Sequence, residues 1–266
     1  MSNAASIAIA SSLIWDNWQA GTVLTELPLA YRPQNRADGY AIQSMLAVKA
    51  EKGLIGWKIA ATSAAGQHHI GVDGPLAGRL IGERTFATGV TLSLAANRMR
   101  VAEPEFAFRV GRALSPRRAP YDVDDVLAAM DALIPSLEVP DSRFSDFAKA
   151  GTAQLIADNA CAHEFVLGTP TAADWRAIDL AAHPVRAELN GTGTRRVLRD
   201  GIGSNVLGDP RVALTWLVNE LSSLGVTLTA GQIVTTGSCM QPLAIEPGDA
   251  VHADFGVLGS ISARFT

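Results

Sequence analysis

The sequence predicts an α+β fold, and three observations carry that prediction. Helical patterns are concentrated in the first third of the 266-residue chain. From about residue 98 onward, the patterns are mostly those of strands. Two helical segments interrupt these strands without the regular alternation of a βαβ protein, which is typical of an α+β architecture.

The first third is expected to contain two long helices and a short one. The segments SIAIASSLIWDNWQAG (6–21) and ADGYAIQSMLAVKAEKG (37–53) both have helical patterns. The second segment offers Asp38 as an N-cap and Gly53 as a stop. LIGWKIA (54–60) predicts a strand, and Ser63 could cap a short helix that follows it.

The later part of the chain is expected to contain eight strands and two helices. The pair Asn190-Gly191 is typical of a hairpin turn between two of these strands. One helix is expected over Val123–Ala132. The other is expected over Pro210–Leu224, with Asp209 as its N-cap and the proline at the first helical position. The strand candidates are Met99–Val110, Leu133–Val139, Glu164–Leu167, Val185–Asn190, Arg195–Leu198, Gln232–Thr236, Ala250–Phe255 and Ser260–Phe265.

Composition and charge argue against several kinds of partner. The chain has a net charge of −4 and a pI near 5.7, with no basic run, so we expect no nucleic-acid partner. No apolar run is long enough to span a membrane, and the N-terminus lacks the basic region of a signal peptide, so we expect no membrane association. The two cysteines match no metal or redox spacing, which favours a cytoplasmic location.

Residues 100–108, RVAEPEFAF, place two acids in a strand that otherwise looks half buried. Glu103 and Glu105 are two residues apart and point to one face, while Phe106 and Phe108 point to the other. From this pair alone, a strand with one wet face is the simpler interpretation, because charged residues are mostly exposed. Pro104 cannot donate to a ladder, so we expect this strand to lie at an edge or to be bulged here.

Glu138 is a third acid, in the strongly apolar segment ALIPSLEVPDSRF. A charged group in such a strand more often has a partner than not. Three carboxylates that converge on one point form a hard oxygen site, which suits Mg²⁺ or Mn²⁺ and leaves positions for water and substrate.

Eight segments, taken in order, carry a resemblance to a known family. They are GWKIAATS, VAEPEFAF, PSLEVPDSRF, IADNACA, LNGTG, VLGDPRVALTWLVNEL, GQIVTTGS and EPGDAVHADFGVLGSISARF. In this order and spacing, they resemble the 2-keto-4-pentenoate hydratase and 4-oxalocrotonate decarboxylase branch of the fumarylacetoacetate hydrolase superfamily. The resemblance covers most of the chain, from about Gly53 to the C-terminus, and the N-terminal helices fit it too.

The resemblance implies a fold, a substrate class and partners. The fold is a mixed β-sandwich roll core like the C-terminal part of fumarylacetoacetase, at residues 81–266, with a smaller helical region packed on it, at residues 1–80. Members act on small 2-oxo or 2-hydroxydienoic acids from aromatic-compound catabolism. They are usually homo-oligomers, and a complex with a sister enzyme of the same pathway is possible.

The resemblance also implies roles for four charged residues. It makes Glu103, Glu105 and Glu138 the ligands of a divalent metal, Mg²⁺ or Mn²⁺, which would hold a 2-oxo acid and act as a Lewis acid on it. It makes Lys58 a catalytic proton-transfer group. The residues alone leave another interpretation open, in which Lys58 is an edge lysine that snorkels to solvent. Beside a dication in a desolvated pocket, its pKa would tend downward.

Five further residues are candidates for substrate binding, each with a structural alternative. The hydroxyls of Thr62 and Ser63 could bind a substrate carboxylate, or Ser63 could only cap a helix. Thr236 and Ser238 could contact substrate or form a turn. Cys161 could line the pocket or pack as a buried thiol.

Softer expectations concern other polar residues. Asp158 and Asn159 could support the metal site or bond backbone. Arg143 could pair with a substrate carboxylate or with Asp141. Surface or helix-capping positions are expected for His68 and His69.

Leu76 departs from the hydratase pattern. The segment after the short helix in hydratases of this branch typically reads Pro-Asp-Phe-Gly, and that aspartate is thought to help deliver water. Here it reads GVDGPLAGRL, with Leu76 at the aspartate position. Decarboxylases of the branch tend to have an apolar residue there, so Leu76 is expected to line the substrate pocket and favours decarboxylation.

The activity expected from the whole pattern is that of a metal-dependent lyase of the hydratase type, with 4-oxalocrotonate-type decarboxylation as the alternative. Hydrolysis of a C–C bond is a weaker candidate, because the N-terminal region has no matching Glu/His pair. A non-catalytic partner subunit of the same fold is the alternative of a different class. The presence of all three glutamates together with Lys58 argues against that alternative.

Overall fold

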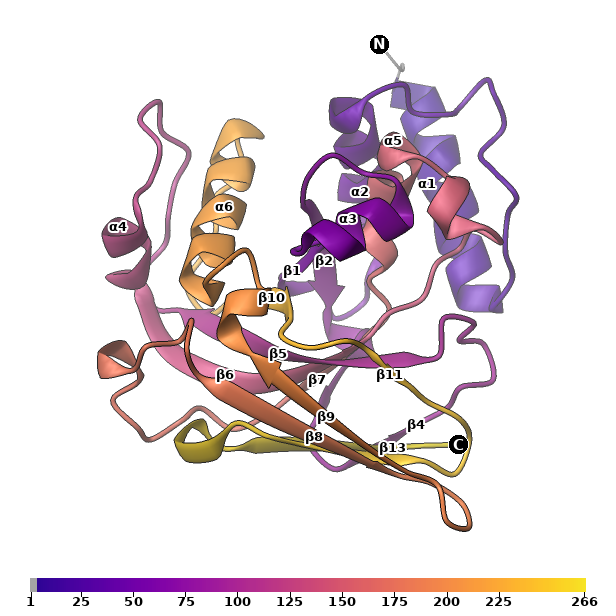
Figure 1. The fold of residues 1–266 in the computed structure, drawn as a ribbon. Coiled ribbons are helices and arrows are strands. Elements are labelled where there is room, and N and C mark those ends of the chain that lie inside the picture. The colour runs from indigo at the N-terminus through magenta and orange to yellow at the C-terminus, as the bar shows by residue number, and fades with distance from the viewer. Residues whose placement is uncertain (1–3) are drawn as a thin grey trace.

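The structure is a computed structural model that describes residues 4–266, and in this range it is built from two sheets and six α-helices (Figure 1). The helices are α1 (Ala4–Ala20), α2 (Arg36–Lys49), α3 (Ala64–Ile70), α4 (Val123–Leu127), α5 (Thr152–Ala157) and α6 (Pro210–Ser223). The mixed α and β architecture predicted from the sequence is confirmed. In residues 4–266, no helix is both long enough and apolar enough to cross a membrane.

The larger sheet curls on itself into a roll. Its strand order is β2-β1-β10-β5-β6-β7-β3, and β11 also pairs with β5. β2 and β3 lie at opposite ends of this order, yet only residues 82–84 separate them along the chain. Because so short a connection spans little distance, the two ends of the sheet must approach each other. The strands are β1 (Leu54–Ala60), β2 (Leu76–Ile81), β3 (Thr85–Ala87), β5 (Val101–Val110), β6 (Met130–Val139), β7 (Glu164–Leu167), β10 (Ile233–Ser238) and β11 (Leu243–Ala244).

The inner face of the roll is apolar at one end. Its buried cluster includes Leu80, Ala107, Ile134, Phe165 and Ile233, which come from five different strands. Alternate residues of a strand share a face. The acids of β5 and β6 therefore extend the same inner face toward the other end of the roll.

The smaller sheet covers the outer face. Its order is β4-β13-β12-β8-β9, with bounds Val90–Leu92, Ser260–Phe265, Ala250–Asp254, Pro184–Asn190 and Arg196–Ile202. Phe106 packs edge-on against Phe255, with 5.2 Å between ring centroids, and Phe108 packs against Trp175 at 5.6 Å. The two phenylalanines thus point away from the inner face, and the predicted packing of two β layers is confirmed.

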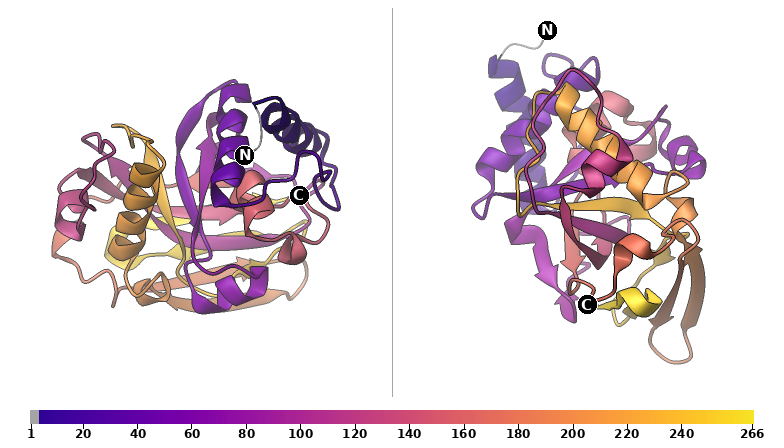
Figure 2. Two further views of the ribbon diagram at one scale, coloured as in Figure 1. Left: turned by 90° about the horizontal axis from the view of Figure 1, so that it is seen from above. Right: turned by 90° about the vertical axis from the view of Figure 1, so that its left-hand side faces the viewer.

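The N-terminal helices form a separate cluster on the roll. Ile14 of α1 packs with Ile42 and Leu46 of α2 and with Phe144. Seen from above, α1 and α6 lie on opposite sides of the strands between them (Figure 2). The expected boundary after residue 80 falls inside β2, because β1 and β2 belong to the larger sheet, so the two parts of the chain share one sheet.

Several predicted boundaries were wrong. The N-cap of α2 is Asn35, whose side chain accepts a hydrogen bond from the amide of Asp38, and not Asp38 itself. The helix expected over Val123–Ala132 ends at Leu127, because the chain enters β6 at Met130 to pair with β5. Asp209 does cap α6, as predicted, by accepting a hydrogen bond from the amide of Arg211.

Candidate active site

Three glutamates converge at the inner end of β5 and β6. Glu103 is paired with Glu138 across the two strands, and Glu105 lies two residues along β5. One carboxylate oxygen from each acid lies within 4.8 Å of the others. Glu105 and Glu138 are fully buried, and Glu103 is half buried. The wet-face interpretation of this pair is therefore wrong.

The charges of these acids are poorly compensated by the protein. Burial raises the pKa of all three carboxyl groups. The charge of Glu138 raises the pKa of Glu103 further, to about 7, and it also raises the pKa of Glu105. The oxygens Glu105 Oε1 and Glu138 Oε2 are buried and accept no hydrogen bond from the described residues, while Glu138 Oε1 has the Lys58 ammonium 3.0 Å away. Buried acceptors without donors are costly. Three converging carboxylates provide the oxygen ligands that a hard divalent cation prefers.

A bulge in β10 orients Glu105. The register between β10 and β5 shifts between Thr235 and Ser238, which are paired with Ala107 and Glu105. Within the bulge, Gly237 has φ +97° and its amide donates to Glu105 Oε2 at 2.9 Å, while Thr235 Oγ1 donates to the same oxygen. The prediction from Pro104 was wrong, because the bulge lies in the partner strand β10, β5 pairs with β6 without a shift at Pro104, and β5 lies in the middle of the sheet.

Lys58 is buried beside the acids. Its Nζ lies 3.0 Å from Glu138 Oε1 and donates to the carbonyl of Ala160 at 2.9 Å. The side chain is 4% exposed, which excludes a snorkelling lysine. Gly78 lies opposite on β2, where a Cβ atom would approach the Lys58 side chain to 2.9 Å, so glycine leaves it room.

The charge environment of Lys58 differs from the expected one. Burial lowers the pKa of Lys58, but the charges of Glu138 and Glu103 outweigh burial, so the pKa lies above its usual value. The downward shift expected beside a bound dication stays a prediction. The sequence could not show how closely the three acids surround this ammonium group.

A strained segment presents the carbonyl that Lys58 contacts. Asn159, Ala160 and Cys161 have positive φ values of 58°, 50° and 60°. Such residues cost on the order of 1–3 kcal/mol each and persist only when neighbours hold them. Here the side-chain amide of Asn159 exchanges two hydrogen bonds with the backbone of Arg79, at 2.7 and 2.9 Å.

A buried ion pair anchors the same segment. The carboxylate of Asp158 pairs with Arg143 and accepts a hydrogen bond from Ser142 at 2.6 Å. Arg143 is fully buried, bonds the carbonyls of Asp141 and Ala162 and does not line the cavity beside Lys58, and its carboxylate partner is Asp158 in place of the expected Asp141. Asp158 and Asn159 hold backbone, which was one of the two expectations for them.

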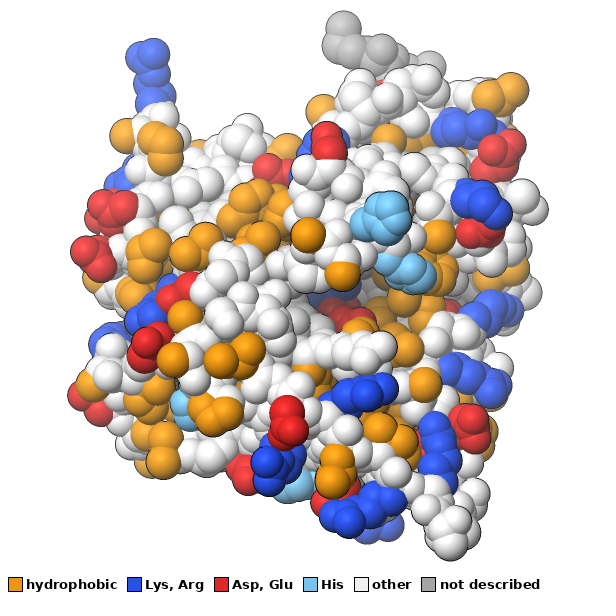
Figure 3. Space-filling model, viewed as in Figure 1, with side chains coloured by type: hydrophobic (Ala, Val, Ile, Leu, Met, Phe, Trp, Pro, Cys, Tyr) orange, Lys and Arg blue, Asp and Glu red, His pale blue; other side chains and the backbone are white. Residues whose placement is uncertain are grey.

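A cavity of about 700 Å³ opens above Lys58 and Glu103. Of the residues expected to bind substrate, Thr62, Ser63, Leu76, Cys161 and Ser238 line it. Figure 3 shows a hollow in the centre of this face, with acidic atoms inside it and histidines near its rim. Ser63 also caps α3, by accepting a hydrogen bond from the amide of Gly66, so its two expected roles are compatible.

Thr236 is the exception among the expected residues. It is fully buried outside the cavity lining, and its hydroxyl donates to the carbonyl of Phe106 at 2.9 Å. Alternation along β10 turns the side chain of Thr236 away from the inner face. Thr235, which is paired with Ala107, is the neighbour that contacts Glu105.

Several lining residues were not predicted from the sequence. His69, which was expected at the surface or at a helix cap, lines the cavity and packs against Phe147, with 5.8 Å between ring centroids. Met99, Leu155 and Gln241 also line it. They come from loops and helix ends far apart in the chain, so no local pattern indicates them.

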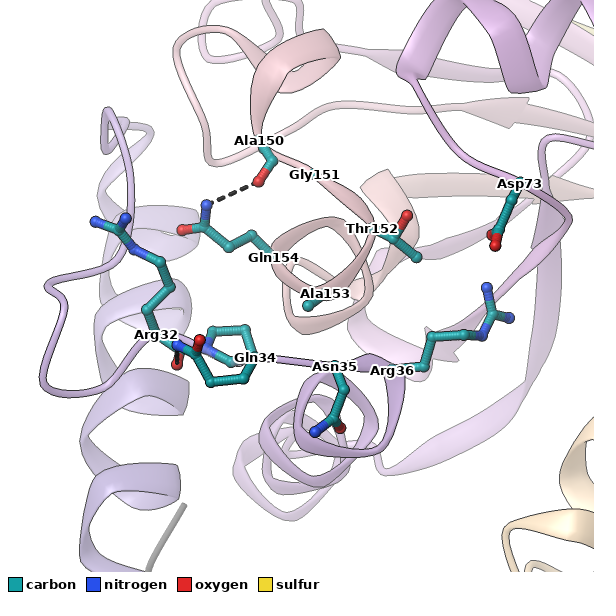
Figure 4. A pocket seen from close by; sticks show the side chains of 11 residues that line it. Arg32, Gln34, Asn35, Arg36, Asp73, Ala150, Gly151, Thr152, Ala153 and Gln154 are labelled. Carbon is teal, nitrogen blue, oxygen red and sulfur yellow. Dashed lines mark hydrogen bonds between the residues drawn. The ribbon is translucent and has the colours of Figure 1, made fainter. Parts of the chain in front are cut away.

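A second hollow, of about 480 Å³, lies between the start of α2 and α5 (Figure 4). Its two arginines already have partners. Arg32 pairs with Glu26 at 2.6 Å and Arg36 with Glu220 at 2.9 Å. None of the three clustered glutamates lines it, so it is separate from the candidate metal site.

Comparison with known proteins identifies the family of this chain. The family model described as "Fumarylacetoacetate (FAA) hydrolase C-terminal" matches residues 83–266. The chain belongs to the fumarylacetoacetate hydrolase family. Within it, the chain is 33% identical to a 4-oxalocrotonate decarboxylase from Pseudomonas putida over 88% of this chain and 87% of the relative. It is 29% identical to a 2-keto-4-pentenoate hydratase from Paraburkholderia xenovorans (strain LB400), over 96% and 93%.

Solved structures of this family include a similar fold. The 4-oxalocrotonate decarboxylase from Pseudomonas putida G7, complexed with magnesium and adipate, has a TM-score of 0.87 and 25% identity. The match covers 100% of this chain and 99% of that one. The family and branch predicted from the sequence segments are therefore confirmed.

Proposed function

We propose that this chain is a divalent-metal-dependent lyase that adds water to small 2-hydroxydienoic acids, in the manner of a 2-keto-4-pentenoate hydratase. The observation that carries the proposal is the convergence of Glu103, Glu105 and Glu138 beside a buried Lys58 at one end of a cavity. Relatives named as hydratases and as decarboxylases of such acids support it.

The three glutamates would hold Mg²⁺ or Mn²⁺. Glu105 Oε1 and Glu138 Oε2 are buried without donors, whereas the other oxygen of each carboxylate is held, by Thr235 and Gly237 for Glu105 and by Lys58 for Glu138. A bound divalent cation would supply Lewis acidity toward the carboxylate and C2 oxygens of a 2-oxo acid. The remaining steps fall to the side chains of the cavity.

Lys58 is the group proposed to move protons along the substrate carbon chain. Its Nζ lies between Glu138 and the carbonyl of Ala160 and borders the cavity, so it is fixed where a substrate would lie. General acid–base groups act from such fixed positions. The hydroxyls of Thr62 and Ser63 are proposed to bind the substrate carboxylate.

Leu76 supports decarboxylation as a second candidate. It is fully buried, lines the cavity and is paired with Ala60, two residues along β1 from Lys58. An isobutyl group cannot orient a water molecule, and it desolvates a neighbouring charge. Decarboxylation of a 2-oxo-3-enedioate would use that environment, whereas hydration would need another polar group to hold the water.

In the deciding experiment, purified protein is incubated with Mg²⁺ and a simple 2-hydroxydienoate and, separately, with Mg²⁺ and a 2-oxo-3-enedioate. Products are identified by NMR. We expect loss of the dienoate ultraviolet absorbance and formation of a 4-hydroxy-2-oxo acid, which a chelator abolishes. Release of CO₂ from the enedioate without hydration of the dienoate would instead assign decarboxylation. No turnover of either would contradict the proposal and favour a non-catalytic subunit.

Leu76→Asp sharpens the same experiment. The variant should shift turnover toward water addition, because a carboxylate can hold and deprotonate water. Leu76→Asn is the matched control, since it is polar and similar in size but a poor base. We further propose that the enzyme works as a cytoplasmic homo-oligomer; its two cysteines are both free and buried.

A further inference from the structure

The cavity changes character with distance from the acids. At one end are Lys58 and Glu103, with the hydroxyl of Thr62 close by. The rest of the wall is dominated by apolar side chains from α3, β2, α5 and three loops. They are Ile70, Leu76, Met99, Phe147, Leu155 and Met240.

Strand geometry gives this change a direction. Leu76 faces Ala60, and Gly78 faces Lys58, so Leu76 lies two residues beyond Lys58 along the paired strands. Two residues of a strand span about 7 Å. A substrate held by its carboxylate near the acids would therefore extend its tail past Leu76, toward the wall formed by α3 and Phe147.

The apolar part is larger than a short substrate needs. A cavity of about 700 Å³ lies within the range, roughly 300–1,000 Å³, of pockets that bury drug-sized ligands. A five-carbon acid would leave much of the apolar wall without contact. Apolar surface is stabilised when a ligand removes it from water.

The apolar part offers little to a second negative charge. Among the lining residues, all within the described chain, Lys58 is the single lysine or arginine, and it already pairs with Glu138. The hydroxyl of Ser238 donates to the carbonyl of Met240 at 2.8 Å. His69 is the remaining basic group, and its ring packs against Phe147. Apart from His69, a carboxylate buried here would have no cationic partner, and an unpaired buried charge is costly.

We infer that the substrate of this site is a 2-oxo or 2-hydroxydienoic acid with an uncharged apolar tail, longer than that of a five-carbon acid, and that the cavity discriminates against dicarboxylic acids. This inference rests on the proposed function for the orientation of the substrate. It adds the chemistry of the tail, which the acids and Lys58 do not determine.

Binding of unreactive analogues tests the tail directly. Saturated 2-oxo acids are titrated into the full-length protein with Mg²⁺ by calorimetry: 2-oxobutanoate, 2-oxohexanoate, 2-oxo-5-phenylpentanoate and 2-oxoadipate. Each buried methylene should strengthen binding about fourfold, so 2-oxohexanoate should bind at least about tenfold more tightly than 2-oxobutanoate. The phenyl compound should bind more tightly still. 2-Oxoadipate, which replaces a terminal methyl by a carboxylate, should bind at least about tenfold more weakly than 2-oxohexanoate.

Paired variants locate the effect. Met99→Lys introduces a cation into the apolar wall and should narrow or reverse the preference for 2-oxohexanoate over 2-oxoadipate. Met99→Gln, of similar length but neutral, should leave the order of the two ligands unchanged. His69→Gln removes the remaining basic group and should also leave the order unchanged.

The outcomes separate this inference from the proposed function. If the wild type bound 2-oxoadipate as tightly as 2-oxohexanoate, or more tightly, and His69→Gln lost that binding, the inference would be overturned and His69 would be a carboxylate ligand. This conclusion would hold even if dienoates are turned over. The expected binding order without any turnover would support the inference and reject the lyase. No binding of any 2-oxo acid would overturn both.

Discussion

Along β5 and β6, the inner face of the roll passes from an apolar end, at Ala107 and Ile134, to an acidic end, at Glu105 and Glu138. The apolar end is complete within the chain, because its side chains fill the space between neighbouring strands. The acidic end is incomplete, because buried oxygens of two acids lack hydrogen-bond donors. Stability and function are thus placed on one continuous surface, and substitutions at the two ends should have opposite signatures.

The largest effect is expected from Lys58→Ala. If Lys58 moves protons, kcat should fall by about 10²–10⁴, the usual range for a general acid–base group. Metal affinity should change little, or rise slightly, because a positive charge beside Glu138 is lost. Steady-state kinetics and Mg²⁺ titration check both. Lys52→Ala, at an exposed lysine before β1, is the control, and turnover of Lys58→Ala equal to that of Lys52→Ala would refute the role.

Glu105→Gln should separate metal binding from stability. Loss of an anionic ligand should weaken Mg²⁺ at least about a hundredfold, since even supporting residues are worth about 10–100-fold. In metal-free protein the same change should raise the melting temperature, because burial and the charges of Glu138 and Glu103 disfavour the Glu105 carboxylate. Added Mg²⁺ should stabilise the wild type but not the variant.

Glu164→Gln is the control for this substitution. Glu164 is also buried, on the neighbouring strand β7, but it lies 3.8 Å from Arg84 and outside the cluster. This variant should keep the Mg²⁺-dependent rise in melting temperature. If Glu105→Gln retained that rise as well, Glu105 could not be a ligand.

More of the acidic end than of its surroundings could be predicted from the sequence. The i and i+2 spacing placed Glu103 and Glu105 on one face, and an acid in an apolar strand indicated Glu138. Segment resemblance added Lys58. The strand β2 was missed, although its start at Leu76 lines the cavity, because GPLAGRLIGE contains three glycines and shows no alternation.

The rest depended on contacts between distant segments. The left-handed run at Asn159–Cys161 has no local signal, because none of its residues is glycine. It exists because Asp158 pairs with Arg143 and Asn159 bonds β2. Thr236 depends on the pairing with β5, because alternation allows only one of the two threonines to face the acids, and the pairing of Thr235 with Ala107 decides which one.

Thr235→Val tests how Glu105 is oriented, and a smaller effect is expected. Thr235 Oγ1 donates to Glu105 Oε2, so the isosteric variant removes one hydrogen bond that orients the acid. Metal affinity should fall by about tenfold or somewhat more, the range for residues that support a ligand. Thr236→Val is the matched control, because its hydroxyl bonds only the backbone of Phe106. Equal loss of Mg²⁺ affinity in both would show that the bulge, and not the hydrogen bond, holds Glu105.

The smallest effect is expected at the apolar end. Ile134→Val removes one buried methyl group and should lower the free energy of unfolding by about 0.5–1.5 kcal/mol, which denaturant titration measures. Ile202→Val, at a partly exposed position of β9, should change it by less than about 0.5 kcal/mol.

Mg²⁺ affinity should be unchanged in Ile134→Val, for a geometric reason. Ile134 and Glu138 are four residues apart on β6, which corresponds to about 13 Å along a strand. Sites separated by more than about 7–10 Å without shared partners usually act independently. The two ends of the roll should therefore respond separately. A tenfold loss of Mg²⁺ affinity in Ile134→Val would show instead that packing at the apolar end positions the acids, and that stability and metal binding cannot be changed independently.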